Sequence, residues 1–146
     1  MNMKEETNLS LLFPRQLANK ILAHAQHNPE TEICGLVSTK NNQAKNYYPI
    51  PNIAANTTTL FEMDAKAQID AIKKMREQGE ELLAIVHSHP HSIAEPSALD
   101  QAQHQYPEAY YLIVSLNTVG VLELRAFKQV GHHFKAVELI IDHPVN

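Results

Sequence analysis

The 146-residue sequence has a single cysteine, four glycines and no long apolar run. One cysteine cannot form an internal disulfide bond, so we expect a reducing, cytoplasmic setting. No segment approaches the roughly 20 apolar residues that span a membrane, and residues 1–8 lack the apolar stretch of a signal peptide. Four glycines and the absence of a G-x-G-x-x-G motif argue against a dinucleotide-binding Rossmann fold.

Basic residues are also scarce, because 12 Lys and Arg stand against 16 Asp and Glu and give a formal net charge of -4. Nucleic-acid binding depends on clustered Lys and Arg, so we expect no nucleic-acid partner. Hydrophobic residues make up 44% of the chain, which is enough for a packed core at this length. We therefore expect a single domain over residues 1–146.

Hydrophobic periodicity and turn residues predict the order of helices and strands. The predicted strands cover residues 9–13, 31–39, 43–50, 60–63, 82–86, 109–115, 119–128 and 132–142, the last of which could instead be part of a helix. The predicted helices cover residues 14–28 and 64–78, and a third begins near Ser97. On the second helix, the residues predicted to face the core are Ala65, Ile69, Ile72 and Met75. This order indicates an α/β sandwich with a central mixed sheet flanked by helices.

The apolar strand before residue 87 ends in the sequence H-S-H-P. Side chains alternate along a strand, so His87 and His89 share one face, with Cβ atoms roughly 7 Å apart. Pro90 turns the chain out of the sheet, and the following helix start can bring Asp100 over both imidazoles. Two histidines and one carboxylate with a fourth position open are typical of a catalytic zinc. Two structural explanations compete: an H-x-H pair can arise by chance, and Ser97 and Asp100 also form an S-x-x-D capping box.

Glu32 stands at the start of a strand that is apolar on both faces. It is either an exposed strand end or a carboxylate tuned for catalysis. We interpret Cys34 as a core residue, because no local group would activate a thiol nucleophile there. Gly35 leaves room for another backbone or a substrate. His104 lies one helical turn after Asp100 and could be a partner of a ligand or a fourth ligand.

Together these residues resemble the JAMM motif of the MPN-domain metalloproteases, which reads E, then H-[ST]-H-P, then S-x-x-D. Glu32, His87-Ser88-His89-Pro90, Ser97 and Asp100 match it at every position. The likeness to the short, single-domain bacterial members continues through E-I-C-G-L at 32–36, P-N at 51–52 and F-E-M-D at 61–64. It covers most of the chain from Leu11 to about Lys128, and it implies a cytidine-deaminase-like, MPN-type α/β sandwich.

The resemblance also implies a Zn²⁺-dependent peptidase or isopeptidase. In that scheme His87, His89 and Asp100 hold the zinc, Glu32 is the general base, and Ser97 hydrogen-bonds the oxyanion. Short bacterial relatives act on ubiquitin-like sulfur-carrier proteins, so the expected substrate is such a carrier, cut after its C-terminal Gly-Gly. The segments with which eukaryotic deubiquitinating members grip a ubiquitin pair have no room here.

Two other functions are compatible with parts of this pattern. A zinc peptidase for cell-wall or phage-associated peptides would use the same catalytic residues. A non-catalytic MPN scaffold would bind partners without chemistry, but such scaffolds lack one or more ligands and this chain lacks none. A zinc deaminase is excluded because H-x-E and P-C-x-x-C are both missing. The sequence leaves open whether the chain forms a homodimer.

Overall fold

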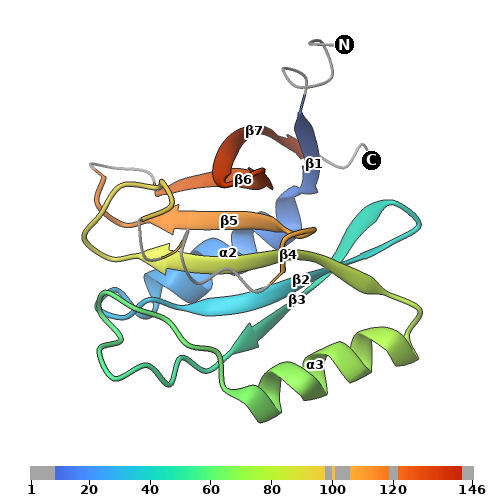
Figure 1. Ribbon diagram of the computed structural model, residues 1–146, viewed down its shortest axis with the longest axis horizontal. Coiled ribbons are helices and arrows are strands. Elements are labelled where there is room, and N and C mark those ends of the chain that lie inside the picture. The colour runs from blue at the N-terminus through green and yellow to red at the C-terminus, as the bar shows by residue number, and fades with distance from the viewer. Residues whose placement is uncertain (1–8, 98–99, 101–105, 119–121, 143–146) are drawn as a thin grey trace.

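The computed structural model describes residues 9–97, 100, 106–118 and 122–142 (Figure 1). In chain order its helices and strands are β1 (Ser10–Pro14), α2 (Arg15–Gln26), β2 (Cys34–Lys40), β3 (Gln43–Ile50), α3 (Ala65–Glu77), β4 (Glu81–His89), β5 (Tyr110–Ser115), β6 (Glu123–Val130) and β7 (His133–Asp142). Asn41 and Asn42 both have positive φ, of 54° and 63°, which suits the tight hairpin turn between β2 and β3.

The strands form one seven-stranded mixed sheet in the order β1-β7-β6-β5-β4-β2-β3. The pairs β1–β7 and β4–β5 are parallel, and the other four pairs are antiparallel. β1 also contacts β3, so the two edges of the sheet approach each other and the sheet curls around α2. Figure 1 shows α2 behind the strands and α3 beside β3. The predicted α/β sandwich with a mixed sheet is confirmed.

Each face of the sheet has its own apolar core, because side chains alternate along the central strands. On the α2 face, Ile33, Val37, Ala84 and Val86 pack with Leu17 and Ile21 of the helix. On the α3 face, Cys34, Leu36, Ile85 and Ile113 pack with Ala71 and Met75. The face to which a residue of β2 or β4 points therefore decides which helix it meets.

Helix α3 begins where predicted, because the Asp64 carboxylate accepts a hydrogen bond from the amide of Ala67 at 3.0 Å. It ends at Glu77 with Gln78 as its C-cap, and the next residue, Gly79, has a φ of 72° that suits the chain reversal after a helix. The predicted buried stripe is wrong in part, since Ile69 is 65% exposed and Ala65 is exposed. The buried side runs through Ala71 and Met75 instead.

Other boundaries differ by a few residues from those predicted. The expected strand over 60–63 is reduced to an isolated bridge between Asn52 and Met63. The segment predicted over 132–142 is the strand β7, which begins at His133, and is not part of a helix. The helix expected from Ser97 lies largely outside the described residues, although Asp100 has helical backbone. Among the described residues, no helix is both long and apolar enough to cross a membrane.

Candidate metal centre

Strand β4 carries His87 and His89 on the face of the sheet that α3 covers. In the antiparallel register with β2, Cys34 pairs with His87, and Ser88 donates its amide to the Ile33 carbonyl. Continuing this register by one step sets Glu32 opposite His89. Residues directly opposite in an antiparallel pair share a face, so the Glu32 carboxyl and both imidazoles lie on the same side of the sheet.

Three ligand atoms form a nearly equilateral triangle. The Nε2 atoms of His87 and His89 are 3.2 Å apart, and Asp100 Oδ2 lies 3.2 Å from the first and 3.1 Å from the second. A tetrahedral zinc with bonds of 2.0–2.1 Å separates its ligand atoms by about 3.4 Å. The triangle is therefore close to the size of one face of a zinc tetrahedron, and its chemistry of two imidazoles and one carboxylate suits that ion.

The surroundings of the two imidazoles fix how they present their nitrogens. His89 Nδ1 lies 2.7 Å from the Ile93 carbonyl, which can only accept, so this nitrogen is the donor, and Nε2 once deprotonated would direct its lone pair to a metal. His87 is fully buried and stacks on Phe61, with ring centroids 4.5 Å apart and an interplanar angle of 18°. Both rings are thus held with Nε2 towards Asp100.

Burial and hydrogen bonding set the charges of these groups. Burial lowers the pKa of His87, which favours the neutral imidazole that a metal requires. Burial opposes ionisation of Asp100, but hydrogen bonds from His87 and His89 outweigh it and hold the pKa of Asp100 well below its usual range. Burial would likewise lower the pKa of His89, yet its hydrogen bonds to Asp100 and the Ile93 carbonyl raise it.

Glu32 is only 4% exposed, so the alternative of an exposed strand end is wrong. Burial raises its pKa to about 8; His89 opposes this rise and Asp100 adds to it. A carboxyl with a pKa near neutrality is suited to accept and release a proton. The ligand-type atoms of Glu32, His87 and His89 also lie within 4.8 Å of one another, so Glu32 competes with Asp100 for the role of third ligand.

Ser97 and Asp100 form the capping box that their spacing predicted. Ser97 Oγ accepts from the Asp100 amide at 3.0 Å, and Asp100 Oδ2 accepts from the Ser97 amide at 2.8 Å. The cap therefore holds the Asp100 carboxylate beside the two histidines, so a structural role of Asp100 is compatible with metal binding. The Ser97 hydroxyl proton remains available as a donor, because the oxygen is the acceptor in this cap.

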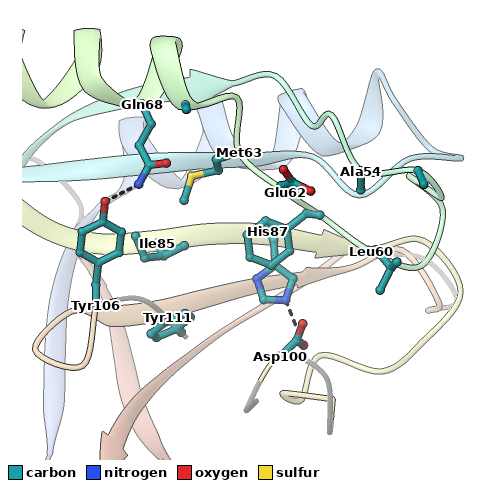
Figure 2. Close-up of a pocket in the computed structure, with 13 residues that line it drawn as sticks. Ala54, Leu60, Glu62, Met63, Gln68, Ile85, His87, Asp100, Tyr106 and Tyr111 are labelled. Carbon is teal, nitrogen blue, oxygen red and sulfur yellow. Dashed lines mark hydrogen bonds and ion pairs between the residues drawn. The ribbon is translucent and has the colours of Figure 1, made fainter. Parts of the chain in front are cut away.

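A cavity of about 700 Å³ opens beside the triangle (Figure 2). Figure 2 shows His87 and Asp100 on one side of it and a hydrogen bond between Gln68 and Tyr106 on the other. Its wall is mainly apolar, and the lining residues include Ala54, Leu60, Phe61, Met63, Ile85 and Tyr111. The segment between β3 and α3 supplies six of the thirteen lining residues. The size of the cavity is in the range of pockets that bind small ligands or peptide segments.

The remaining residues singled out in the sequence have structural roles. Cys34 is fully buried, donates to the Ile50 carbonyl, and has a pKa raised to about 12 by burial and by Glu32, so it is a core residue and not a nucleophile. The space beside Gly35 is filled by Tyr47, since a Cβ there would lie 2.5 Å from Tyr47 Cε1. A Cβ there would also lie 2.7 Å from the Tyr48 carbonyl oxygen, so Gly35 makes room for a neighbouring backbone, one of the two predicted alternatives, and not for a substrate. His104 lies outside the described residues.

Sequence reasoning missed two residues beside the centre. Phe61 stacks on His87, and Asn52 hydrogen-bonds the Glu32 carbonyl. An aromatic side chain in a polar loop and an asparagine directly after a strand were the available signals. Neither identifies its partner, because both partners are distant in the sequence.

The curled sheet, the buried carboxyl and the two histidines with an adjacent aspartate define a metallopeptidase-type site on an MPN fold. Residues 14–128 match the family described as prokaryotic homologs of the JAB domain, and the chain belongs to this JAMM/MPN metalloprotease family. The archaeal JAB1/MPN domain protein AF2198 of Archaeoglobus fulgidus shares the fold at a TM-score of 0.59, with 18% identity, over 92% of this chain and 98% of that chain.

Three curated relatives are similar to this chain over most of its length. The desampylase of Haloferax volcanii is 24% identical over 93% of this chain and 99% of its own length. The CysO-cysteine peptidase of Mycobacterium bovis is 27% identical over 89% of this chain and 90% of its own. A probable TtuB-protein conjugate cleaving protease of Thermus thermophilus is 33% identical over 82% of this chain and 76% of its own length.

Proposed function

We propose that the chain is a zinc-dependent peptidase that hydrolyses the bond following the C-terminal Gly-Gly of a ubiquitin-like sulfur-carrier protein. The observation that carries the proposal is the triangle of His87, His89 and Asp100 with a buried, elevated-pKa carboxyl at Glu32 beside it. A structural zinc would instead have four protein ligands and no unused carboxyl next to it.

Each of these residues then has a defined task. His87, His89 and Asp100 would hold the zinc, which supplies Lewis acidity for water activation and carbonyl polarisation. Glu32 takes the proton of the attacking water and passes it to the leaving amine, as its pKa of about 8 permits. The Ser97 hydroxyl donates to the oxyanion of the tetrahedral intermediate, a contact typically worth about 3 kcal/mol of barrier.

The choice of substrate rests on the cavity and on the relatives. A cavity of about 700 Å³ with apolar walls can take an extended peptide tail, and glycines at the reacting end allow close approach to the metal. The names of two relatives specify a CysO-cysteine bond and TtuB-protein conjugates as their substrates. We extend this class of substrate, a small carrier joined through its C-terminus to an amine, to the present chain.

The test is cleavage of defined conjugates by the zinc-loaded protein, followed by mass spectrometry. The substrates are a small carrier that ends in Gly-Gly joined to cysteine or to a peptide, the same carrier with Ala-Ala in place of Gly-Gly, and murein peptides. We expect cleavage directly after Gly-Gly and none of the Ala-Ala carrier. Cleavage of murein peptides alone would favour the cell-wall alternative, and zinc binding without any cleavage would favour the scaffold.

A further inference from the structure

The side chain of Asn52 uses all of its hydrogen-bonding capacity. Its Nδ2 donates to the Glu32 carbonyl at 2.9 Å and to the Leu60 carbonyl at 2.8 Å. Its Oδ1 accepts from the amides of Ala54 and Glu62, both at 3.0 Å. Only a carboxamide offers two donors and two acceptor sites in this planar arrangement. The position therefore demands asparagine more strictly than an ordinary loop residue does.

One of these four bonds reaches the residue that we assign as the general base. The Glu32 backbone is held at its carbonyl by Asn52 and at its amide by the Thr57 carbonyl. The Glu32 side chain, in contrast, has a buried Oε1 with no hydrogen-bond partner among the described residues. The direction of the carboxyl thus depends on how the backbone is held, because that oxygen has no hydrogen-bond partner to orient it.

The other three hydrogen bonds of Asn52 go to backbone groups of Leu60, Ala54 and Glu62, which line the cavity. Asn52 forms a bridge with Met63, and Ile53 donates its amide to the Glu62 carbonyl at 2.8 Å. These contacts join the two ends of the segment that carries Phe61, the residue stacked on His87. One amide group therefore connects the backbone of Glu32 to the loop that covers a metal ligand.

We propose that Asn52 is a positioning residue, which acts on the reaction by holding Glu32 over the metal centre; this inference rests on the proposed peptidase function. None of the four side-chain hydrogen bonds of Asn52 goes to the triangle, and Asn52 is not among the residues that line the cavity, so its effect would pass through Glu32. A displacement of about 1 Å in a catalytic group can lower turnover about 10²-fold, so the loss of the hydrogen bond from Asn52 to Glu32 should have a measurable effect on turnover.

The informative variant is Asn52→Asp, which has nearly the same shape but replaces the donor to Glu32 and Leu60 with an acceptor. Asn56→Asp is the matched control, because Asn56 lies in the same loop and its Oδ1 accepts from the Thr58 amide, a contact that aspartate preserves. Both proteins are loaded with zinc, and their zinc content, amide exchange and steady-state kinetics are compared with wild type. If Asn52→Asp does not fold, Asn52→Ala replaces it, since it removes the donor without adding charge.

We expect Asn52→Asp to bind zinc stoichiometrically and to exchange the Glu32 amide at least about tenfold faster than wild type. Its kcat should fall about 10²-fold while KM changes by less than about threefold. The Asn56→Asp control should match wild type in all three measurements. Unchanged exchange at Glu32 would overturn the proposal whether or not the protein is an active peptidase.

A double variant separates positioning from a general structural effect. If Asn52 acts through Glu32, adding Asn52→Asp to Glu32→Gln should lower the residual kcat no further. An equal loss of kcat in both backgrounds would show that Asn52 acts independently of Glu32 and would reject the proposal. A wild-type protein that cleaves no Gly-Gly conjugate would refute the proposed function, whereas the exchange measurement would still decide whether Asn52 holds Glu32.

Discussion

Ser88 and Ile33 are joined across two neighbouring strands by a pair of hydrogen bonds. The Ser88 amide donates to the Ile33 carbonyl at 3.0 Å, and the Ile33 amide donates to Ser88 Oγ at 2.8 Å. Ser88 is fully buried on the face of β4 opposite the histidines. It therefore attaches the residue after Glu32 to the strand that carries both imidazoles.

We predict that Ser88→Ala destabilises the protein, because the buried Ile33 amide loses its acceptor. An unsatisfied buried donor costs about 1–3 kcal/mol, which urea unfolding of the zinc-free protein can measure. Ser88→Thr keeps the hydroxyl and should recover most of the loss. Equal stability of Ser88→Ala and wild type would show that water replaces the hydroxyl and that the contact contributes little.

A second prediction concerns the metal ligands. Zinc should raise the free energy of unfolding of the wild type by about 4 kcal/mol at a free concentration a thousand times its Kd. Asp100→Ala should abolish this stabilisation, since it removes one corner of the ligand triangle. Asp70→Ala is the control, because Asp70 is an exposed partner of Lys66 on α3 and should leave the zinc effect intact. Full stabilisation of Asp100→Ala by zinc would remove Asp100 from the ligand set.

The local parts of the site could be predicted from the sequence because their geometry follows from short-range rules. Alternation along β4 put His87 and His89 on one face, and the S-x-x-D spacing predicted the cap between Ser97 and Asp100. Both features depend on residues fewer than four apart. The structure confirms the shared face and the cap.

The parts that sequence reasoning missed depend on partners that are distant along the chain. The buried side of α3 is one example, because Ala71 is buried whereas the larger Ile69 is 65% exposed. Gly35 is another, because its free space is filled by Tyr47 from the paired strand. Periodicity shows that a helix or strand has an apolar side, but the register of packing decides which residues meet.

The raised pKa of Glu32 predicts how stability of the zinc-free protein changes with pH. The pKa is about 8 in the fold and near the ordinary value of 4.5 in the unfolded chain, so the fold favours the protonated carboxyl. That contribution is fully present below pH 4.5 and is lost as the pH rises through 8. Glu32→Gln mimics the neutral carboxyl at every pH, so the variant should not lose this contribution to stability as the pH rises.

The difference in unfolding free energy between Glu32→Gln and wild type should therefore widen in favour of the variant from pH 5 to pH 8.5. We expect a change of roughly 2 kcal/mol, after a discount for solvent screening of a partly buried carboxylate. Taking the difference cancels the groups that do not interact with Glu32, whereas His89 interacts with it and contributes to the change. Chemical unfolding at four or five pH values measures it, and parallel curves for the two proteins would mean that Glu32 has an ordinary pKa.

The role of Glu32 as base and not as ligand is decided by metal content and turnover together. Glu32→Gln keeps the shape of the side chain and removes its basicity, so it should retain stoichiometric zinc while kcat falls at least about 10²-fold. Loss of zinc in Glu32→Gln, with retention in Asp100→Ala, would assign Glu32 as the third ligand, which its proximity to His87 and His89 allows. Glu77→Gln is a suitable control, since Glu77 is exposed at the end of α3 and is not among the residues that line the cavity. Metal analysis and single-turnover cleavage of a Gly-Gly conjugate measure zinc content and turnover on one preparation. The assignment of Glu32 as the base requires that Glu32→Gln keeps its zinc and loses turnover.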